Sequence, residues 1–260
     1  MRFADKVAII TGAGTGIGRD MAIGFVREGA RVCVAARRKE LLEETADLAA
    51  RAGGERPLVL PMDLTVESDV DAMADCVAER FGGIDFMINN AAYAGQDLAV
   101  QEQTLENWNQ VIATNLTSQF LVARASLRHM IPRRSGVILT FSSTAALRGF
   151  ERKSHYTASK LGIFGFTRTL ALEVGRYGIR ANTVVPGAVK TELLAGYWKR
   201  IAGERGVDVR IVEEEFGREA ALGRAVEPGE VTKTVMFLCS DDASGITGQE
   251  IRVCAGAAMG

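Results

Sequence analysis

A glycine-rich stretch near the start of the chain, residues 11–18 (TGAGTGIG), constrains the fold more than any other feature. It follows residues 7–10 (VAII), an apolar and mostly β-branched run that is typical of a buried strand. Apolar residues near helical spacing come next and end at residues 28–29 (EG), so the stretch joins a strand to a helix. Such a turn offers backbone N–H groups and a helix N-terminus to a phosphate, which indicates a cofactor site.

The glycine spacing is not the common dinucleotide fingerprint. Gly12, Gly16 and Gly18 give G-x-x-x-G-x-G, whereas G-x-G-x-x-G fails because Ile17 and Arg19 stand where that pattern would continue. An ordinary tight loop is the alternative interpretation, but the position between a strand and a helix favours a ligand site.

Length, charge and cysteine usage exclude several classes of protein. A chain of 260 residues is one large α/β domain or two small ones, and its net charge of −1 gives no reason to expect nucleic acid or an anionic membrane as partner. Only two histidines and four scattered cysteines are present, so we expect no metal site. We expect the cysteines to be free thiols, buried at Cys33, Cys76 and Cys239, in a reduced cytoplasmic enzyme.

Strand and helix patterns alternate along nearly the whole chain. Predicted strands cover residues 7–10, 31–35, 58–60, 84–88, 136–141 and 179–185. After the helix that ends at residues 28–29, four further helices are predicted. One covers residues 39–52, and the next begins after a cap at Thr65 or Ser68 and ends at residue 81. The last two cover residues 105–131, where Pro132 ends the helix, and residues 156–174. No repeat or low-complexity linker interrupts the pattern. The alternation predicts a single doubly wound (Rossmann) parallel sheet in an α/β domain, with helices on both faces.

Polar residues follow the expected strand ends, where ligands bind in such folds. These residues are Thr11, Asp63, Asn89, Asn90, Ser142, Ser143 and the pair Pro186-Gly187. Each is a common turn residue on its own. Their joint placement predicts a binding site along one edge of the sheet.

These motifs together resemble the short-chain dehydrogenase/reductase family, of the 3-oxoacyl-(acyl-carrier-protein) reductase type, across nearly the whole chain. The matching residues are Thr11-Gly12 with Gly16-Ile17-Gly18, Asp63-Leu64, Asn89-Asn90-Ala91, Asn115, Ser143, Tyr156 with Lys160, Pro186-Gly187 with Thr191, and Gly248-Gln249. The resemblance implies an enzyme that transfers hydride between a nicotinamide cofactor and a ketone or secondary alcohol. The chain departs from the family at Ala92, where glycine is usual, and at Cys254-Ala255, where Asp-Gly is usual. Neither departure removes a catalytic group.

The chemistry of the pair Tyr156 and Lys160 follows from their spacing. They are four residues apart, so they lie on the same face of a helix, and an ammonium near a phenol lowers the phenol's pKa. A phenol tuned in this way exchanges a proton with a substrate oxygen as general acid or base. The resemblance implies the other roles: Ser143 positions the substrate oxygen, Lys160 also binds the nicotinamide ribose, and Asn115 holds a proton-relay water.

The resemblance also implies the residues of the cofactor site. They are Gly12, Thr15, Gly16, Ile17, Gly18, Arg37, Arg38, Asp63, Leu64, Asn90, Ala91, Tyr156, Lys160, Pro186, Gly187, Val189 and Thr191. The second strand is followed by Arg37-Arg38 and by no acidic residue before Glu40, which favours the 2′-phosphate of NADP over the free ribose of NAD. A solvated basic helix start is the alternative, and Thr15 stands where some NADP-dependent relatives carry a second basic residue.

Between residues 188 and 226 the alternation breaks, and in the family this segment is the substrate lid. With Ser143, we expect five residues to line the substrate pocket: Tyr93, Ala94, Phe150, His155 and Trp198. The resemblance further implies a homotetramer that packs through the helices around Asn115 and Tyr156.

Three functions remain open from the sequence. The first is an NADP-dependent carbonyl reductase, acting for example on a 3-oxoacyl thioester, and the second is an NAD-dependent alcohol, sugar or steroid dehydrogenase. The third is a non-catalytic cofactor-sensing protein, which would be free to lose Tyr156, Lys160 or Ser143 and has lost none. A G-x-S-x-G hydrolase is excluded because the motif is absent.

Overall fold

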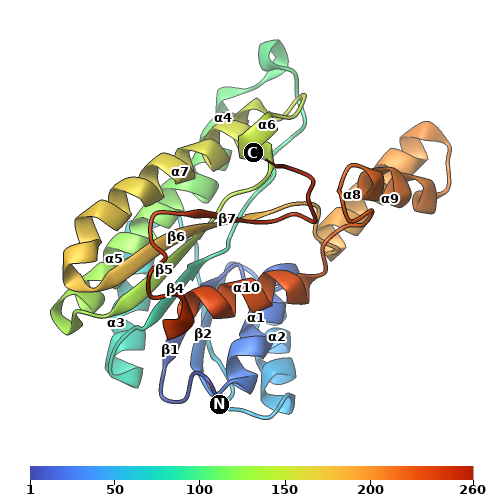
Figure 1. Ribbon diagram of the computed structural model, residues 1–260. Helices are drawn as coiled ribbons and strands as arrows, with labels where there is room; N and C mark the ends of the chain where they lie inside the picture. The colour runs from blue at the N-terminus through green and yellow to red at the C-terminus, as the bar shows by residue number, and fades with distance from the viewer. Residues whose placement is uncertain (260) are drawn as a thin grey trace.

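The computed structural model describes residues 1–259 and contains a seven-stranded parallel sheet (Figure 1). The strands are β1 (Val7–Thr11), β2 (Arg31–Ala36), β3 (Leu58–Pro61), β4 (Phe86–Asn89), β5 (Gly136–Phe141), β6 (Ile179–Pro186) and β7 (Glu250–Val253). They lie in the order β3-β2-β1-β4-β5-β6-β7, and every neighbouring pair is parallel. The predicted doubly wound architecture is confirmed.

Helices cover both faces of the sheet. They are α1 (Gly16–Arg27), α2 (Lys39–Arg51), α3 (Glu67–Phe81), α4 (Leu105–Ile112), α5 (Ser118–Arg133), α6 (Ala145–Arg148), α7 (Ser154–Val174), α8 (Glu192–Arg205), α9 (Val209–Arg218) and α10 (Pro228–Cys239). Successive strand residues pack into two separate apolar cores on opposite faces of the sheet. Ile10 faces α1, α2 and α10, whereas Ile9 faces α3, α5 and α7. The helices therefore form a layer on each side of the sheet (Figure 1).

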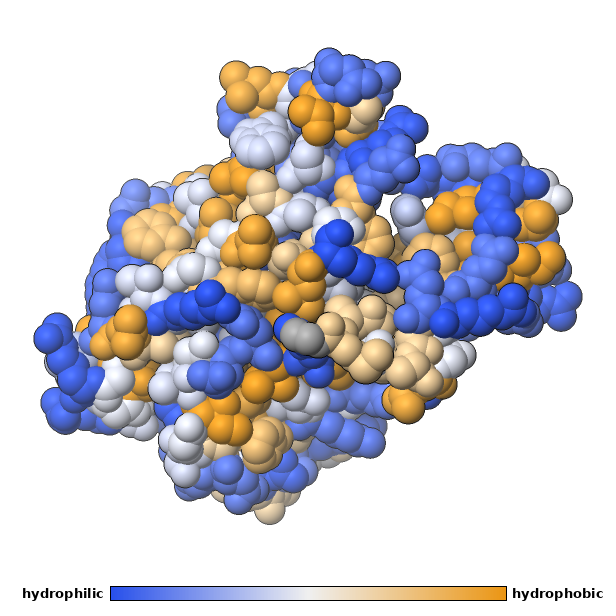
Figure 2. Space-filling model, turned by 45° about the horizontal axis from the view of Figure 1, so that its top comes forward, coloured by the Kyte–Doolittle hydropathy of each residue, from blue (hydrophilic) through white to orange (hydrophobic). Residues whose placement is uncertain are grey.

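Helices α8 and α9 project away from the sheet as a separate lobe (Figure 1). They have an apolar cluster of their own around Trp198 and Val212. Figure 2 shows hydrophilic residues at the rim of this lobe and a hollow between it and the body. The lobe lies within the segment where the strand–helix alternation of the sequence breaks.

Several local predictions were wrong. The predicted helix 105–131 is divided by a π-helical turn at Ala113–Thr117, and it continues through Pro132 because proline's fixed φ is itself close to helical. The cap of α3 is Val66 rather than Thr65 or Ser68. Cys76 is exposed, not buried, because it faces outward on α3.

Within residues 1–259, no helix is both long enough and apolar enough to span a bilayer.

Candidate active site

The glycine-rich turn between β1 and α1 forms one wall of a cleft of about 1590 Å³ along the carboxyl ends of the strands. Gly12 has a φ of 65°, and a Cβ there would lie 2.7 Å from the Cα of Ala91. A Cβ at Gly18 would lie 2.4 Å from the carbonyl oxygen of Gly12, so neither position tolerates a side chain. Thr15 precedes α1 without capping it, so the side chain leaves the first N–H groups of the helix to other partners.

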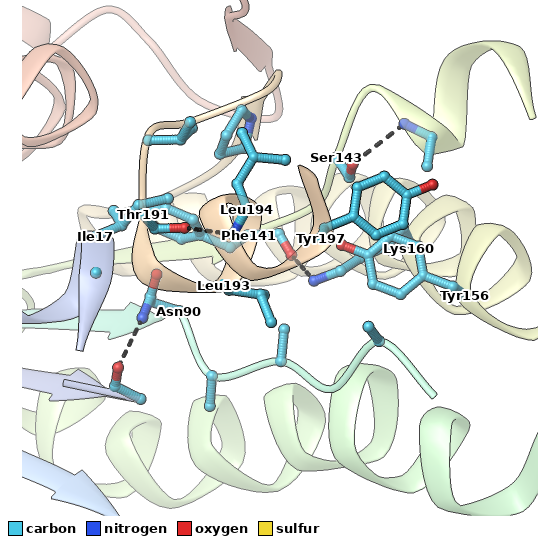
Figure 3. A pocket seen from close by; sticks show the side chains of 18 of the residues that line it. Ile17, Asn90, Phe141, Ser143, Tyr156, Lys160, Thr191, Leu193, Leu194 and Tyr197 are labelled. Carbon is cyan, nitrogen blue, oxygen red and sulfur yellow. Dashed lines mark hydrogen bonds between the residues drawn. The ribbon is translucent and has the colours of Figure 1, made fainter. Parts of the chain in front are cut away.

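The end of β4 is tied to this turn (Figure 3). The Asn90 side chain donates hydrogen bonds to the carbonyl oxygens of Thr11 (3.0 Å) and Gly12 (3.2 Å). The N–H of Ala91 donates to Thr11 Oγ1 over 3.1 Å. The strand order reverses between β1 and β4, and this is the position at which a doubly wound sheet opens a ligand crevice.

Arg37 and Arg38 follow β2 and line the same cleft. Among residues 1–259, no carboxylate lies within ion-pair distance of either guanidinium. Asp63, which follows β3, accepts hydrogen bonds from the N–H and the hydroxyl of Thr65, and these lower its pKa, helped by the charge of Arg37. This end of the cleft therefore presents two arginines that have no acidic partner.

Ser143, Tyr156 and Lys160 lie together at the other end of the cleft (Figure 3). Ser143 comes directly after β5, and the other two residues share one face of α7, as their spacing predicted. Lys160 is 1% exposed, and its Nζ donates to the carbonyl oxygen of Phe141 over 2.9 Å. Its Nζ also lies 5.6 Å from the centre of the Tyr156 ring.

Burial controls the ionisation of both groups. It lowers the pKa of Lys160 to about 7, because the interior disfavours the charged ammonium. It raises the pKa of Tyr156, an effect that the Ser143 hydroxyl partly opposes. The expected lowering of the Tyr156 pKa by Lys160 is therefore not found in the protein alone, because the ammonium is itself disfavoured.

Asn115 lies in the π-helical turn and is fully buried. Its side chain accepts from the N–H of Tyr93 (2.7 Å) and donates to the carbonyl of Tyr93 (2.9 Å) and to Ser159 Oγ (3.1 Å). The side chain thus holds the loop after β4 against α7 and does not reach the cleft.

Other predicted cofactor residues do line the cleft. They are Gly16, Ile17, Leu64, Asn90, Ala91, Pro186, Gly187, Val189 and Thr191. Thr191 also caps α8 through the N–H of Leu194 (3.4 Å).

Two of the five predicted pocket-wall residues, Ala94 and Phe150, line the cleft. Tyr93 contributes its backbone to Asn115 instead. His155 is fully buried, bonded to Gln103 (2.7 Å) and to the carbonyl of Ala94 (3.1 Å), and burial lowers its pKa. Trp198 turns into the apolar cluster of the lobe rather than toward the cleft.

Tyr197, which is not among the substrate residues predicted from the sequence, lines the cleft beside the position predicted for Trp198. Adjacent helix residues face different directions, so the apolar spacing of this segment does not say which aromatic side chain faces the ligand. Asp97 was also missed. Its carboxylate pairs with Lys153 and with Arg200 of α8 (2.9 Å), which joins the loop after β4 to the lobe.

Comparison with known proteins identifies the family. The family model described as enoyl-(acyl carrier protein) reductase matches residues 12–258. A short chain dehydrogenase/reductase of Aspergillus oryzae is 35% identical over 255 residues, which cover 98% of this chain and 95% of the relative. The chain belongs to the short-chain dehydrogenase/reductase family.

Solved structures of this family superpose closely on the chain. A crystal structure of a variant of actinorhodin polyketide ketoreductase with NADPH has a TM-score of 0.92 and 34% identity, and covers 99% of this chain and 98% of its own. NAD⁺-bound xylitol dehydrogenase has a TM-score of 0.90 and 29% identity, and covers 97% of this chain and 99% of its own. The protein is an NAD(P)-dependent oxidoreductase of the short-chain dehydrogenase/reductase family, acting on carbonyl or alcohol substrates.

The cleft of this dehydrogenase/reductase fits a dinucleotide. The glycine turn leaves space where a Cβ would clash, and α1 presents an N-terminus without a side-chain cap. Within the part of the chain that the structure describes, neither arginine of the pair forms an ion pair with a carboxylate. Among residues 1–259, no three His, Cys, Asp or Glu side chains are grouped so as to hold a metal ion.

Proposed function

We propose that the protein is an NADP-dependent carbonyl reductase whose substrate is a ketone, such as a 3-oxoacyl thioester. The observation that carries the proposal is the placement of Arg37 and Arg38 in the same cleft as Tyr156 and Lys160. Guanidinium groups match phosphate geometry and stay charged, which suits the 2′-phosphate that distinguishes NADP from NAD. The NADPH in the structure of the related ketoreductase supports this choice.

The proton comes from the chain's own residues in this proposal, and the reduced nicotinamide supplies the hydride when it is bound. Tyr156 donates its phenolic proton to the substrate oxygen, and its raised pKa keeps it protonated at neutral pH, as a general acid requires. Ser143 donates a hydrogen bond to the same oxygen. Lys160 binds the nicotinamide ribose and stabilises the phenolate that Tyr156 leaves behind.

We propose that Asn115 helps to return a proton from solvent to the active site after the reaction. Its side-chain groups are bonded to Tyr93 and Ser159, so a relay water that connects Lys160 to solvent would bind its backbone carbonyl. That carbonyl accepts a hydrogen bond from the Gln119 side chain (3.0 Å), and a carbonyl oxygen has two lone pairs.

We propose that residues 188–226 form a lid on this single catalytic domain. The two ends of the segment meet in a short parallel bridge, where the N–H of Lys190 donates to the carbonyl of Val226 (2.8 Å). Ion pairs that join the segment to the body include Arg200 with Asp97 (2.9 Å), Arg148 with Glu219 (2.7 Å) and Arg224 with Glu230 (2.7 Å). A hinge held by surface ion pairs is suited to opening and closing over a substrate.

We also propose that the protein assembles as a homotetramer through α5 and α7. Phe120, Leu161 and Leu172 on these helices are 44%, 52% and 85% exposed, so they are available for contact with other copies. Leu121, Phe164 and Leu170 on the same helices are buried within the chain and do not contribute.

The proposed reaction is tested with a panel of ketones, alcohols and sugar alcohols, each mixed with NADPH or NADH, or with the oxidised forms, and monitored by nicotinamide absorbance. We expect NADPH-dependent reduction of at least one ketone. The matched variant is Tyr156→Phe, which keeps the ring and removes the proton donor, and its turnover should fall by roughly 10²- to 10⁴-fold or more with NADPH binding retained. Near-normal turnover by Tyr156→Phe would rule out the mechanism.

An NAD-dependent alcohol, sugar or steroid dehydrogenase is the second candidate, favoured by the close match to NAD⁺-bound xylitol dehydrogenase. In that case the panel would show oxidation of an alcohol with NAD⁺, and NADPH would bind no better than NADH. Binding of a cofactor without turnover of any compound would favour the third candidate, a cofactor-sensing protein.

A further inference from the structure

The last residue of β5 lacks a strand partner on one side. Strand β4 ends at Asn89, which pairs with Thr140, so Phe141 extends one residue beyond it. The N–H of Val137 binds Asp85 on the β4 side, and the N–H of Ser142 binds Val184 of β6. Because successive residues of a strand alternate, the backbone groups of Phe141 point toward the missing end of β4.

The side chain of Gln119 fills this gap. Its Oε1 accepts from the N–H of Phe141 (3.3 Å), and its Nε2 donates to the carbonyl of Phe141 (3.2 Å). The amide therefore bonds both backbone groups of Phe141, as the next residue of a strand would. Gln119 is 1% exposed, so these groups would have no water to replace the amide.

The same amide also reaches the π-helical turn. Gln119 Nε2 donates to the carbonyl oxygen of Asn115 over 3.0 Å, one helical turn earlier. The side chain of Asn89 donates in turn to the carbonyl of Gln119 (3.4 Å). Gln119 thus connects the ends of β4 and β5 to the turn that contains Asn115.

The carbonyl that Gln119 holds is the one that Lys160 binds. Phe141 O accepts from Gln119 Nε2 at 3.2 Å and from Lys160 Nζ at 2.9 Å, and it is the only hydrogen-bond acceptor of the ammonium among residues 1–259. The direction of this carbonyl therefore sets where the buried Lys160 side chain ends, beneath Tyr156.

We propose that Gln119 is a positioning residue for Lys160, and through Lys160 for Tyr156. The inference rests on the proposed function for the catalytic role of Lys160, but the contact between the two side chains through Phe141 can be tested without turnover. Removing the amide frees the Phe141 peptide to turn, and a displacement of about 1 Å near the reacting groups costs up to about 10²-fold in rate.

The test compares Gln119→Met with Thr167→Val. Methionine keeps the length of glutamine and removes its hydrogen-bonding groups. Thr167 of α7, the helix that carries Lys160, bonds Thr140 of β5 over 2.8 Å. Thr167→Val therefore removes a buried hydrogen bond to the same strand without touching Phe141. Thr167→Val is the control for lost stability, and thermal unfolding measures the stability of both variants.

The first readout uses the cofactor-free protein. Competitive acetylation of lysines followed by mass spectrometry measures how readily Lys160 reacts across a range of pH. We expect Gln119→Met to change the reactivity of Lys160 at least three-fold or so relative to the natural protein, and Thr167→Val to leave it unchanged. Equal reactivity of Lys160 in all three proteins would overturn the proposal, whether or not the chain reduces ketones.

The second readout is steady-state ketone reduction. We expect kcat to fall about 10- to 100-fold in Gln119→Met with the ketone KM within a few-fold, whereas Thr167→Val keeps its kcat. A fall in kcat of the same size in both variants would overturn the proposal, because it would show that Gln119 has only a structural role. If the natural protein reduces no ketone, the proposed function fails while the acetylation result still decides the role of Gln119.

If Gln119→Met does not fold, hydrogen exchange of the natural protein decides the question. The Phe141 N–H should exchange as slowly as the interior amides of β5, because Gln119 Oε1 covers it. Fast exchange at Phe141 would show that the Gln119 contact does not persist and would overturn the proposal.

Discussion

Replacing Lys160 by methionine should make the cofactor-free protein more stable at neutral pH. Lys160 is 1% exposed, and no carboxylate within residues 1–259 pairs with it. Its pKa falls from 10.5 to about 7, which at about 1.4 kcal/mol per pKa unit corresponds to roughly 5 kcal/mol of unfavourable burial. Methionine cannot donate a hydrogen bond to the carbonyl of Phe141, and the loss of this donor lowers the free energy of unfolding by about 1–3 kcal/mol. We therefore expect Lys160→Met to gain roughly 2–4 kcal/mol at pH 7.

The sign of the pH dependence follows from the direction of the pKa change. The folded pKa of Lys160 lies below the unfolded value, so between about pH 7 and pH 10.5 the unfolded chain binds more protons. This group therefore makes the natural protein more stable as the pH rises through that window. The advantage of Lys160→Met is greatest at pH 7 and below, and it declines as the pH approaches 10.5.

Urea unfolding measures the free energy difference at a series of pH values between about 6.5 and 9.5, at a fixed protein concentration. The control is Lys199→Met on α8, because Lys199 is exposed and pairs with no carboxylate among residues 1–259. We expect that control to have no pH-dependent effect. A Lys160→Met variant that is less stable at pH 7, or whose stability difference does not change with pH, would refute the reasoning.

Three further predictions concern the cofactor, the lid and the assembly. The double variant Arg37→Ala/Arg38→Ala should weaken NADPH binding roughly 10- to 150-fold and leave NADH nearly unaffected in fluorescence titrations; equal weakening of both cofactors would mean that the arginines do not select the phosphate. Asp97→Asn loosens the pairs with Arg200 and Lys153, of which the more exposed Arg200 pair is worth about 0.2–1 kcal/mol, so steady-state kinetics should show a rise in KM of no more than a few-fold at low salt and a smaller one at high salt. Light scattering at micromolar concentration should give a tetramer, and a monomer would contradict the proposed assembly.

The sequence predicted most of the sheet because the central strands, from β2 through β6 in the sheet order, are largely buried on both faces. Such strands appear as continuous apolar runs, and the six expected strands are present with ends that shift by no more than two residues. Strand β7 was missed because the charged residues Glu250 and Arg252 alternate with Ile251 and Val253, which makes a weak apolar pattern. Strand β3 is equally short and partly buried but has three successive apolar residues. The polar residues after the strands converge because parallel strands bring their carboxyl ends to one edge.

The substrate side of the site was predicted less well, because it depends on side-chain direction. Tyr197 and Trp198 are neighbours on α8, and only the packing of the lobe decides that Trp198 turns inward and Tyr197 faces the cleft. His155 next to Tyr156 was expected at the pocket wall. A local sequence pattern does not reveal that Gln103, from another segment, binds the imidazole and buries it.

Gln119 illustrates a harder limit. Within a run that the sequence predicts as one continuous helix, a glutamine is expected to face solvent. Its burial depends on two facts from elsewhere in the chain: β4 stops one residue short of the end of β5, and a π-helical turn precedes α5. Neither changes the apolar spacing of the segment, so no periodic pattern reports them. A buried amide that completes a strand end is therefore recognised only when the backbone hydrogen bonds of that strand are counted, and here the count leads from Phe141 to Lys160.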